Sequence, residues 1–66
     1  MNTELKNSLS KTELKISLLL EKGLSNKSIS EHCDISENTV KFHLKNIYKK
    51  LGVHNRLQAV HIIHNK

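Results

Sequence analysis

The segment between Thr39 and Val53 constrains the fold of this chain more than any other part of the sequence. Its aliphatic residues recur at i, i+4, i+7 and i+11, the spacing that puts side chains on one side of an α-helix, and they are Val40, Leu44, Ile47 and Leu51. The helical repeat turns a second group away from this stripe, namely Asn38, Lys41, Phe42, Lys45 and Lys49. A helix that is buried along one side and cationic along the other fits the major groove of DNA, which admits one α-helix.

Helix-capping signals divide the chain into four predicted helices. Ser10 and Glu13 have the spacing of a capping box, in which each side chain satisfies a backbone N–H of the other residue. Ser25 and Ser36 can cap two further helices, and Asn55 opens a second, Asn-headed box. The predicted helices span about residues 11–22, 26–33, 37–51 and 56–64.

Glycine and proline usage agrees with this division. Gly23 and Gly52 each follow a cationic helical run, where a left-handed residue ends a helix. The chain contains no proline, and no segment alternates apolar and polar residues over a useful length. We therefore predict an all-α fold, with a flexible N-terminal segment at residues 1–8 and one domain over residues 9–66.

The apolar sides of the four helices can form one small core. A tight turn at Asp34 and Ile35 joins the second and third helices into a helix-turn-helix, whose second helix enters the major groove while the first crosses the DNA backbone. Besides the stripe that begins at Val40, the predicted core contains Ile16, Leu19, Leu20, Ile29, Cys33, Ile35, Val53, Ala59, Val60 and Ile63.

Charge is distributed unevenly along the chain, whose formal net charge is +5. Residues 1–37 hold all six acidic residues and five lysines, a net charge of −1. Residues 38–66 hold five lysines and Arg56 without an acid, a net charge of +6. This polarity indicates a polyanionic partner for the C-terminal half.

Composition sets further limits. A chain of 66 residues is near the lower limit for folding without staples, and its single cysteine, Cys33, rules out an internal disulfide. The longest apolar run, Leu18 to Leu20, is too short to span a membrane, and the first residues lack a signal-peptide pattern. We expect a cytoplasmic protein with no membrane contact.

An ungapped series of motifs runs along the chain: Leu9-Ser10 with Glu13, Gly23-Leu-Ser-Asn-Lys27, Ile29, Ile35-Ser36, Thr39-Val-Lys41, His43, Ile47, Lys50-Leu-Gly-Val53, Arg56 and Ala59-Val60. In these residues the chain resembles the LuxR/GerE family of bacterial helix-turn-helix regulators. The resemblance implies a four-helix domain that dimerises through its last helix and binds repeated sites near promoters. The chain departs from the family pattern at five positions, where smaller or more polar side chains are expected to lower stability. These positions are Thr12, Ser17, Ser28, Ser30 and Cys33.

The resemblance also suggests roles for residues on the third helix. Lys41, Phe42 and Lys45 match positions from which family members usually reach base edges. Lysine can donate to guanine O6 and N7, and an apolar ring can pack on a thymine methyl group. Two alternatives are that Phe42 folds back onto the second helix as core and that Lys45 is an ordinary solvated lysine.

A second set of residues is expected to contact DNA phosphates. It comprises Thr39, His43, Lys49 and Lys50 on the third helix, and Ser25, Asn26 and Lys27 at the start of the second. Unpaired backbone amides and the helix dipole favour an anion at that helix start, and capping by Ser25 can coexist with this role. Arg56 can bind phosphate, but the family resemblance favours an ion pair with Glu13.

The last helix has apolar or aromatic side chains almost all round. We expect Leu57, His61 and His64 to lie in a symmetric dimer contact, which would suit repeated half-sites. A zinc site is not expected from the five histidines, because zinc needs three or four ligands and no carboxylate lies near His61 and His64. No cofactor is predicted.

Two further leucines stand apart from the predicted core. Leu14 and Leu18 are i, i+4 neighbours on the first predicted helix. They are either scattered surface leucines or a docking patch for RNA polymerase, a second domain or another regulator.

The predicted function is that of a sequence-specific transcription regulator bound to double-stranded DNA. It would be either a stand-alone GerE-like regulator or the C-terminal effector domain of a NarL/LuxR-type response regulator, associated with the bacterial nucleoid. The alternative is a protein-interaction module that binds and modulates another regulator of this type. Enzymatic activity is not expected, because no phosphate-cradling glycine loop or Cys/His cluster occurs.

Overall fold

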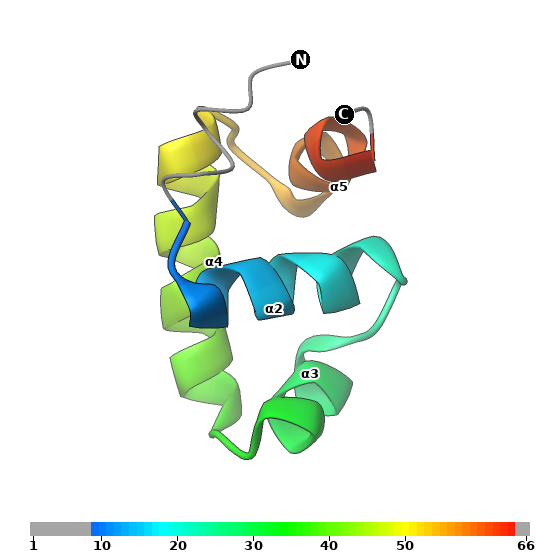
Figure 1. Ribbon diagram of the computed structural model, residues 1–66, viewed down its shortest axis with the longest axis vertical. Coiled ribbons are helices and arrows are strands. Elements are labelled where there is room, and N and C mark those ends of the chain that lie inside the picture. Colours follow the sequence, from blue (N-terminus) through cyan, green and yellow to red (C-terminus); the bar gives the residue numbers. More distant parts are fainter. Residues whose placement is uncertain (1–8, 65–66) are drawn as a thin grey trace.

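The computed structural model describes residues 9–64, so the flexible segment predicted at residues 1–8 lies outside the described residues. Within residues 9–64 the chain forms four helices and no strand (Figure 1). The helices are α2 (Lys11–Glu21), α3 (Asn26–Cys33), α4 (Glu37–Leu51) and α5 (Arg56–His64). The all-α prediction is confirmed, and every predicted helix limit agrees to within one residue.

Side chains cap the helices as the sequence predicts. The Ser10 hydroxyl accepts the N–H of Glu13 at 3.1 Å, and Oε1 of Glu13 accepts the N–H of Ser10 at 2.9 Å, which completes a capping box on α2. Ser25 and Ser36 cap α3 and α4 through the N–H groups three residues ahead. Each hydroxyl satisfies a backbone donor that a helix would otherwise leave unpaired.

The start of α5 departs slightly from the predicted box. Oδ1 of Asn55 accepts the N–H of Gln58 at 2.9 Å, as expected. However, Oε1 of Gln58 accepts the N–H of His54 at 2.8 Å, one residue before the expected donor. The loop residue before the cap is therefore held as well.

A left-handed residue follows each of the first three helices. Gly23 has a φ of +88°, Asp34 of +58° and Gly52 of +73°. The next N–H in each case donates back five residues, as in a Schellman ending, and the bonds are Leu24 to Leu19, Ile35 to Ser30 and Val53 to Tyr48. This shared ending turns the chain sharply after each helix and keeps the connections short.

The core lies where the apolar sides of the helices meet. The buried hydrophobic residues are Ile16, Leu20, Ile29, Val40, Leu44, Ile47, Leu51, Val53, Ala59 and Ile63. Leu19, Cys33, Ile35 and Val60 are partly buried against them, so every predicted core residue contributes to this cluster. The stripe on α4 is therefore the part of the sequence that anchors that helix to the rest of the molecule.

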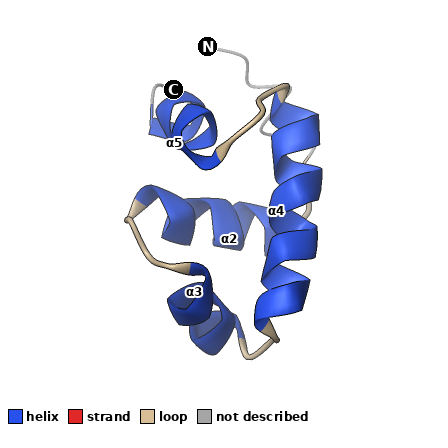
Figure 2. Ribbon diagram, turned by 180° about the vertical axis from the view of Figure 1, so that it is seen from behind, coloured by secondary structure: helices blue, strands red, loops and turns tan. Residues whose placement is uncertain are grey.

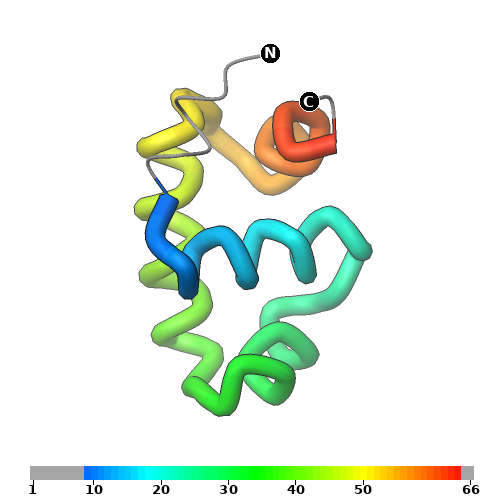
Figure 3. Tube along the Cα trace, in the orientation of Figure 1, coloured from blue at the N-terminus to red at the C-terminus, as the bar shows by residue number. Residues whose placement is uncertain are grey.

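Helices α2 and α4 each pack against the other three helices. Views from opposite sides place α3 and α5 on either side of α2, while α4 runs across all of them (Figures 1 and 2). The tube in Figure 3 shows the chain turning from α3 directly into α4, as in a helix-turn-helix. No helix within residues 9–64 is long and apolar enough to cross a membrane.

An ion pair between α2 and α4 corrects one expectation. Glu13 is 5% exposed, and Oε1 of its carboxylate lies 2.6 Å from Nζ of Lys50. The predicted pairing of Glu13 with Arg56 is wrong, because Lys50 occupies the carboxylate and Arg56 bonds elsewhere. The hydrogen bond from Lys50 holds the pKa of Glu13 below its usual value, against the opposing effect of burial.

Ser17, one of the departures from the family pattern, lies inside the core. The residue is 2% exposed, and its hydroxyl has no hydrogen-bond partner within the described residues. A buried hydroxyl without a partner costs free energy. The loss of stability expected at this position would therefore come from a buried hydroxyl without a partner in place of an aliphatic side chain.

Candidate nucleic-acid interface

The side of α4 opposite the core carries the residues predicted to read bases. Lys41 and Lys45 are exposed, and the Phe42 side chain is 61% exposed. The alternative in which Phe42 folds back into the core is therefore wrong. Its ring contacts the His43 ring edge-on, with centroids 5.7 Å apart, so the neighbouring histidine supports it from one side.

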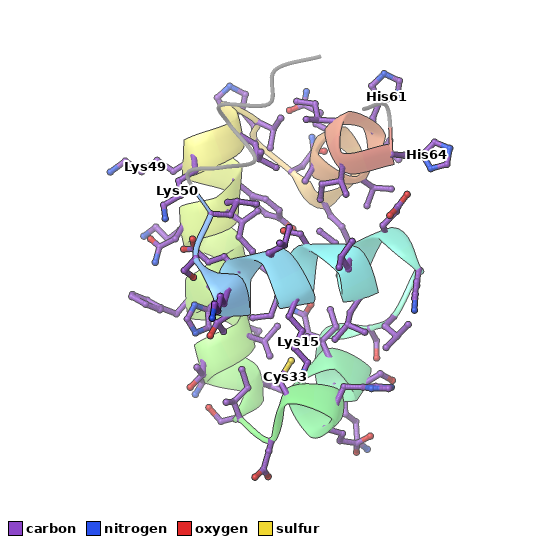
Figure 4. All side chains as sticks on the ribbon, in the orientation of Figure 1. Lys15, Cys33, Lys49, Lys50, His61 and His64 are labelled. Atoms are coloured by element: carbon purple, nitrogen blue, oxygen red, sulfur yellow. The ribbon has the colours of Figure 1, made fainter. Side chains whose placement is uncertain are left out.

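A concave surface lies beside α4 and brings together residues from three segments. Helix α4 supplies Lys41, Leu44, Lys45, Tyr48 and Lys49, while α3 supplies Asn26 and the loop after α4 supplies Gly52, Val53 and His54. Its lining contains no carboxylate, and three lysines one turn apart run along one edge. Figure 4 shows Lys49 extending outward from α4. The surface is thus cationic and open to a large anionic partner.

The start of α3 meets this surface at Asn26. Ser25 uses its hydroxyl to accept the N–H of Ser28 at 3.2 Å, so the predicted capping role is present. The first N–H groups of an α-helix have no partner inside the helix, and here those of Asn26 and Lys27 lie at a helix end without an acidic residue in its first turn. This end can bind an anion through backbone donors and the helix dipole.

Arg56, the first residue of α5, holds this helix end in place. Its Nη1 donates to Oδ1 of Asn26 at 3.2 Å, and its Nη2 donates to the carbonyl oxygen of Leu24. Since Oδ1 of Asn26 is occupied in this way, the amide nitrogen of Asn26 is left to donate to another group. No local pattern predicts this contact, because the two residues lie 30 positions apart.

Tyr48 is a candidate residue that the sequence reasoning missed. It is half-buried and lines the same concave surface as Asn26 and the lysines. Burial raises the pKa of its hydroxyl, against a smaller lowering by the charge of Arg56. The hydroxyl therefore stays protonated at neutral pH and can donate a hydrogen bond. Its position at the edge of the core stripe could have marked it as a residue between core and surface.

The remaining α4 residues predicted to contact phosphate lie outside this surface. Thr39 and His43 are half-buried, and the Thr39 hydroxyl lies 2.9 Å from that of Ser36 in the helix cap. Lys50 turns toward α2, where it pairs with Glu13. The lining of the concave surface thus includes Lys41, Lys45, Lys49 and Asn26 but not these three residues or Phe42.

The exposed side of α5 forms a second hollow at the other side of the same loop. Leu57 is 80% exposed, and it lines this hollow with Val60, His61, Ile62 and His64. Nδ1 of His64 lies 2.9 Å from Oε2 of Glu21, so this histidine also ties α5 to the end of α2. The expectation that no carboxylate lies near His64 is therefore wrong. Among residues 9–64, no three histidine, cysteine or acidic side chains are grouped closely enough to hold a metal ion.

Comparison with known proteins adds evidence independent of this geometry. The family model of bacterial regulatory proteins of the luxR family matches residues 7–63. The chain is 46% identical over 57 residues to the glycerol metabolism activator of Pseudomonas putida, covering 86% of this chain and 26% of that protein. It is 49% identical over 53 residues to the probable transcriptional regulatory protein SgaR of Hyphomicrobium methylovorum, covering 80% of this chain and 25% of that one.

A third relative is the nitrate/nitrite response regulator protein NarL of Escherichia coli, 38% identical over 60 residues, which covers 91% of this chain and 28% of that protein. The chain therefore spans about a quarter of the length of the curated relatives it matches. The names of these relatives are those of regulators and not of enzymes, in agreement with the function class predicted from the sequence.

Proposed function

The chain belongs to the luxR family of bacterial regulatory proteins, and on this premise we propose that it is a sequence-specific DNA-binding domain of a transcription regulator. One observation carries the proposal. The cationic side of α4 and the start of α3 meet in a single concave surface without a carboxylate. A DNA duplex offers both an α-helix-sized groove and a row of phosphates beside it.

Base recognition is assigned to Lys41, Phe42 and Lys45. The two lysines can donate to the guanine edge in the major groove, and the Phe42 ring can pack on a thymine methyl group. Exposure of 61% leaves the ring available for such a contact. Which base each residue reads depends on the operator.

Phosphate contacts are assigned to the residues around the groove-binding helix. The backbone amides at Asn26 and Lys27, the ammonium of Lys49 and the hydroxyl of Tyr48 are donors that can bind backbone oxygens. Ser25, Thr39, His43 and Lys50 remain proposed phosphate contacts, although the Lys50 ammonium would have to share its charge with Glu13. Arg56 is a positioning residue here, because it fixes Asn26 without needing to touch DNA.

Dimerisation through α5 is the second part of the proposal. Leu57 is 80% exposed, and contact of so large an apolar side chain with water is unfavourable. The hollow beside it is lined mainly by apolar residues and histidines. A second copy related by a two-fold axis would cover both, since each copy offers the same surface. His61 and His64 would lie in that contact, and two-fold symmetry would match repeated half-sites.

The test compares the DNA affinity of two variants with a lysine of α4 replaced by alanine with that of a variant in which a lysine of α2 is replaced. An operator is first selected from fragments of genomic DNA. On that duplex Lys45→Ala is expected to cost on the order of 1–3 kcal/mol and to change the sequence preference. Lys49→Ala is expected to weaken all sequences about equally and to lower the salt slope by about one. Lys15→Ala, an exposed lysine on α2, serves as the control and should leave both quantities unchanged.

Binding that shows no salt dependence, or that neither α4 substitution affects, would refute the groove assignment. A module that only modulates another regulator would give that result, because it has no use for an ordered cationic groove. Leu57→Ser tests the dimer separately. It should reduce cooperative binding to paired half-sites while leaving affinity for a single half-site unchanged.

We also propose that the protein lies in the bacterial cytoplasm, associated with the nucleoid.

A further inference from the structure

Two exposed leucines on α2 have no part in the proposed function. Within the described residues the exposed large hydrophobic side chains are Leu14, Leu18, Phe42 and Leu57. Phe42 is assigned to DNA and Leu57 to the dimer contact. Leu14 and Leu18, at 39% and 43% exposure, are one helical turn apart on α2. They therefore form a small apolar pair that is assigned to neither interaction.

Lysines surround this pair. Lys11, Lys15, Leu18 and Lys22 follow one another at i, i+4, i+7 and i+11, so they lie along one line of the helix, and all four are exposed. Figure 4 shows Lys15 on the face turned toward the viewer, whereas Lys49 projects from the edge of the molecule. We refer to Lys11, Leu14, Lys15, Leu18 and Lys22 as the α2 outer surface.

Both acidic residues of α2 have partners on other helices, although Glu21 follows Leu14 and Leu18 at i+7 and i+3 and so lies at the edge of this surface. Glu13 is buried and pairs with Lys50 of α4 at 2.6 Å. Glu21 is half-buried and lies 2.9 Å from Nδ1 of His64 on α5. The opposite side of α2 packs against the other three helices. The α2 outer surface consequently combines three lysines with two leucines, and both carboxylates of α2 are paired with residues of other helices.

We propose that the α2 outer surface binds an acidic, leucine-bearing helical segment of a partner protein. Carboxylates of such a segment would pair with the three lysines, and its apolar side chains would cover Leu14 and Leu18. A second copy of this chain fits less well, because lysine would face lysine. DNA would satisfy the lysines but would leave the leucines in water, and two leucines make too narrow a stripe for a lipid surface.

The size of the surface sets the strength of the contact. Two leucines and three lysines bury less than a standard protein interface, so binding is expected to be weak and transient, with a dissociation constant above about 10 µM. Since the surface shares no residue with the proposed DNA contacts, a partner can bind while the domain is on DNA.

The experiment uses a synthetic helical peptide of about 15 residues with leucines at i and i+4 flanked by glutamates. Backbone amide shifts of the isotope-labelled protein report the contact. The expected shifts are confined to residues 11–22. The double substitution Leu14→Ser and Leu18→Ser should weaken binding about tenfold, because it removes the apolar contact. Leu57→Ser is the matched control and should have no effect. Peptide with glutamine in place of glutamate should also bind at least tenfold more weakly.

Other outcomes overturn the proposal. Shifts on α4 in place of α2 would mean that the peptide only imitates DNA. Concentration-dependent shifts of α2 without peptide would identify a second copy as the occupant. Binding to vesicles of anionic lipid that is lost in the double leucine variant would identify a membrane surface. Circular dichroism shows whether the variants fold, and the affinity of the double leucine variant for DNA is expected to be unchanged. The peptide contact does not depend on the proposed DNA binding. A failure of the unmodified protein to bind DNA would therefore refute the proposed function and leave the peptide proposal to be decided by its own measurement.

Discussion

The ion pair between Glu13 and Lys50 gives the most specific prediction about stability. Glu13→Gln keeps the size of the side chain and its acceptor for the Ser10 N–H but removes the charge that Lys50 meets at 2.6 Å. A hydrogen bond to a charged group contributes about 1.5–3 kcal/mol, and a neutral one about 1. The Glu13 side chain is 7% exposed and that of Lys50 is 38% exposed, so water screens the pair partly. We therefore expect a loss of about 1 kcal/mol.

Thermal unfolding followed by circular dichroism measures this effect. For a domain of this size 1 kcal/mol corresponds to a shift in Tm of roughly 4–8 °C. A double-mutant cycle of Glu13→Gln with Lys50→Met should give a coupling energy of about 1 kcal/mol. The same cycle with Arg56→Met in place of Lys50→Met should be additive, because Arg56 bonds to Leu24 and Asn26 and not to Glu13. Additive effects in the Lys50 cycle, or strong coupling in the Arg56 cycle, would refute the assignment of the pair.

The pair also makes stability depend on pH. Because the pKa of Glu13 is lowered in the folded state, mainly by Lys50, folding favours the ionised carboxylate. Its contribution is complete above the usual value of 4.5 and is lost as the pH falls from there through the lowered pKa. Glu13→Gln should remove this part of the acid destabilisation. A variant that loses stability on acidification as steeply as the unmodified protein would contradict the predicted linkage.

Three further predictions concern other positions. Ser17→Ala removes the buried hydroxyl that has no partner and should raise the free energy of unfolding by up to about 1 kcal/mol, measured by chemical denaturation; a clear loss would mean that the hydroxyl is bonded. Gly52→Ala meets no atom within 4 Å, but its φ of +73° should cost about 1–2 kcal/mol, and an unchanged Tm would contradict that reasoning. Arg56→Met should weaken DNA binding severalfold in the unmodified background but not further in the Asn26→Ala background, since it acts through Asn26. Equal losses in both backgrounds would give Arg56 a direct contact.

Much of the fold was predictable because its signals are local. The Ser10 box, the caps at Ser25 and Ser36 and the left-handed glycines involve residues within a few positions of one another. Each can therefore be identified in the sequence without knowledge of the tertiary structure. Periodicity identified the core for the same reason, since a helix buries residues three and four apart.

The candidate site was predictable only in part. The exposed residues of α4 follow from the helical repeat, and Phe42 lies where that repeat puts it. The predicted contact set did not include Tyr48, and it paired Glu13 with Arg56. Long side chains choose partners according to how the helices cross, and 37 residues separate Glu13 from Lys50. The roles of individual lysines toward bases and phosphates remain predictions.

The helix limits, the buried side of each helix and the region of positive charge can all be read from the sequence, because backbone hydrogen bonding and helical periodicity act over a few residues. The packing of the helices brings Asn26 beside the lysines of α4 in one surface and places Arg56 where it bonds to Asn26. The packing also gives both acids of α2 partners on other helices, while the lysines and two leucines of α2 stay exposed. These contacts depend on how the helices pack around α2, which no local pattern specifies.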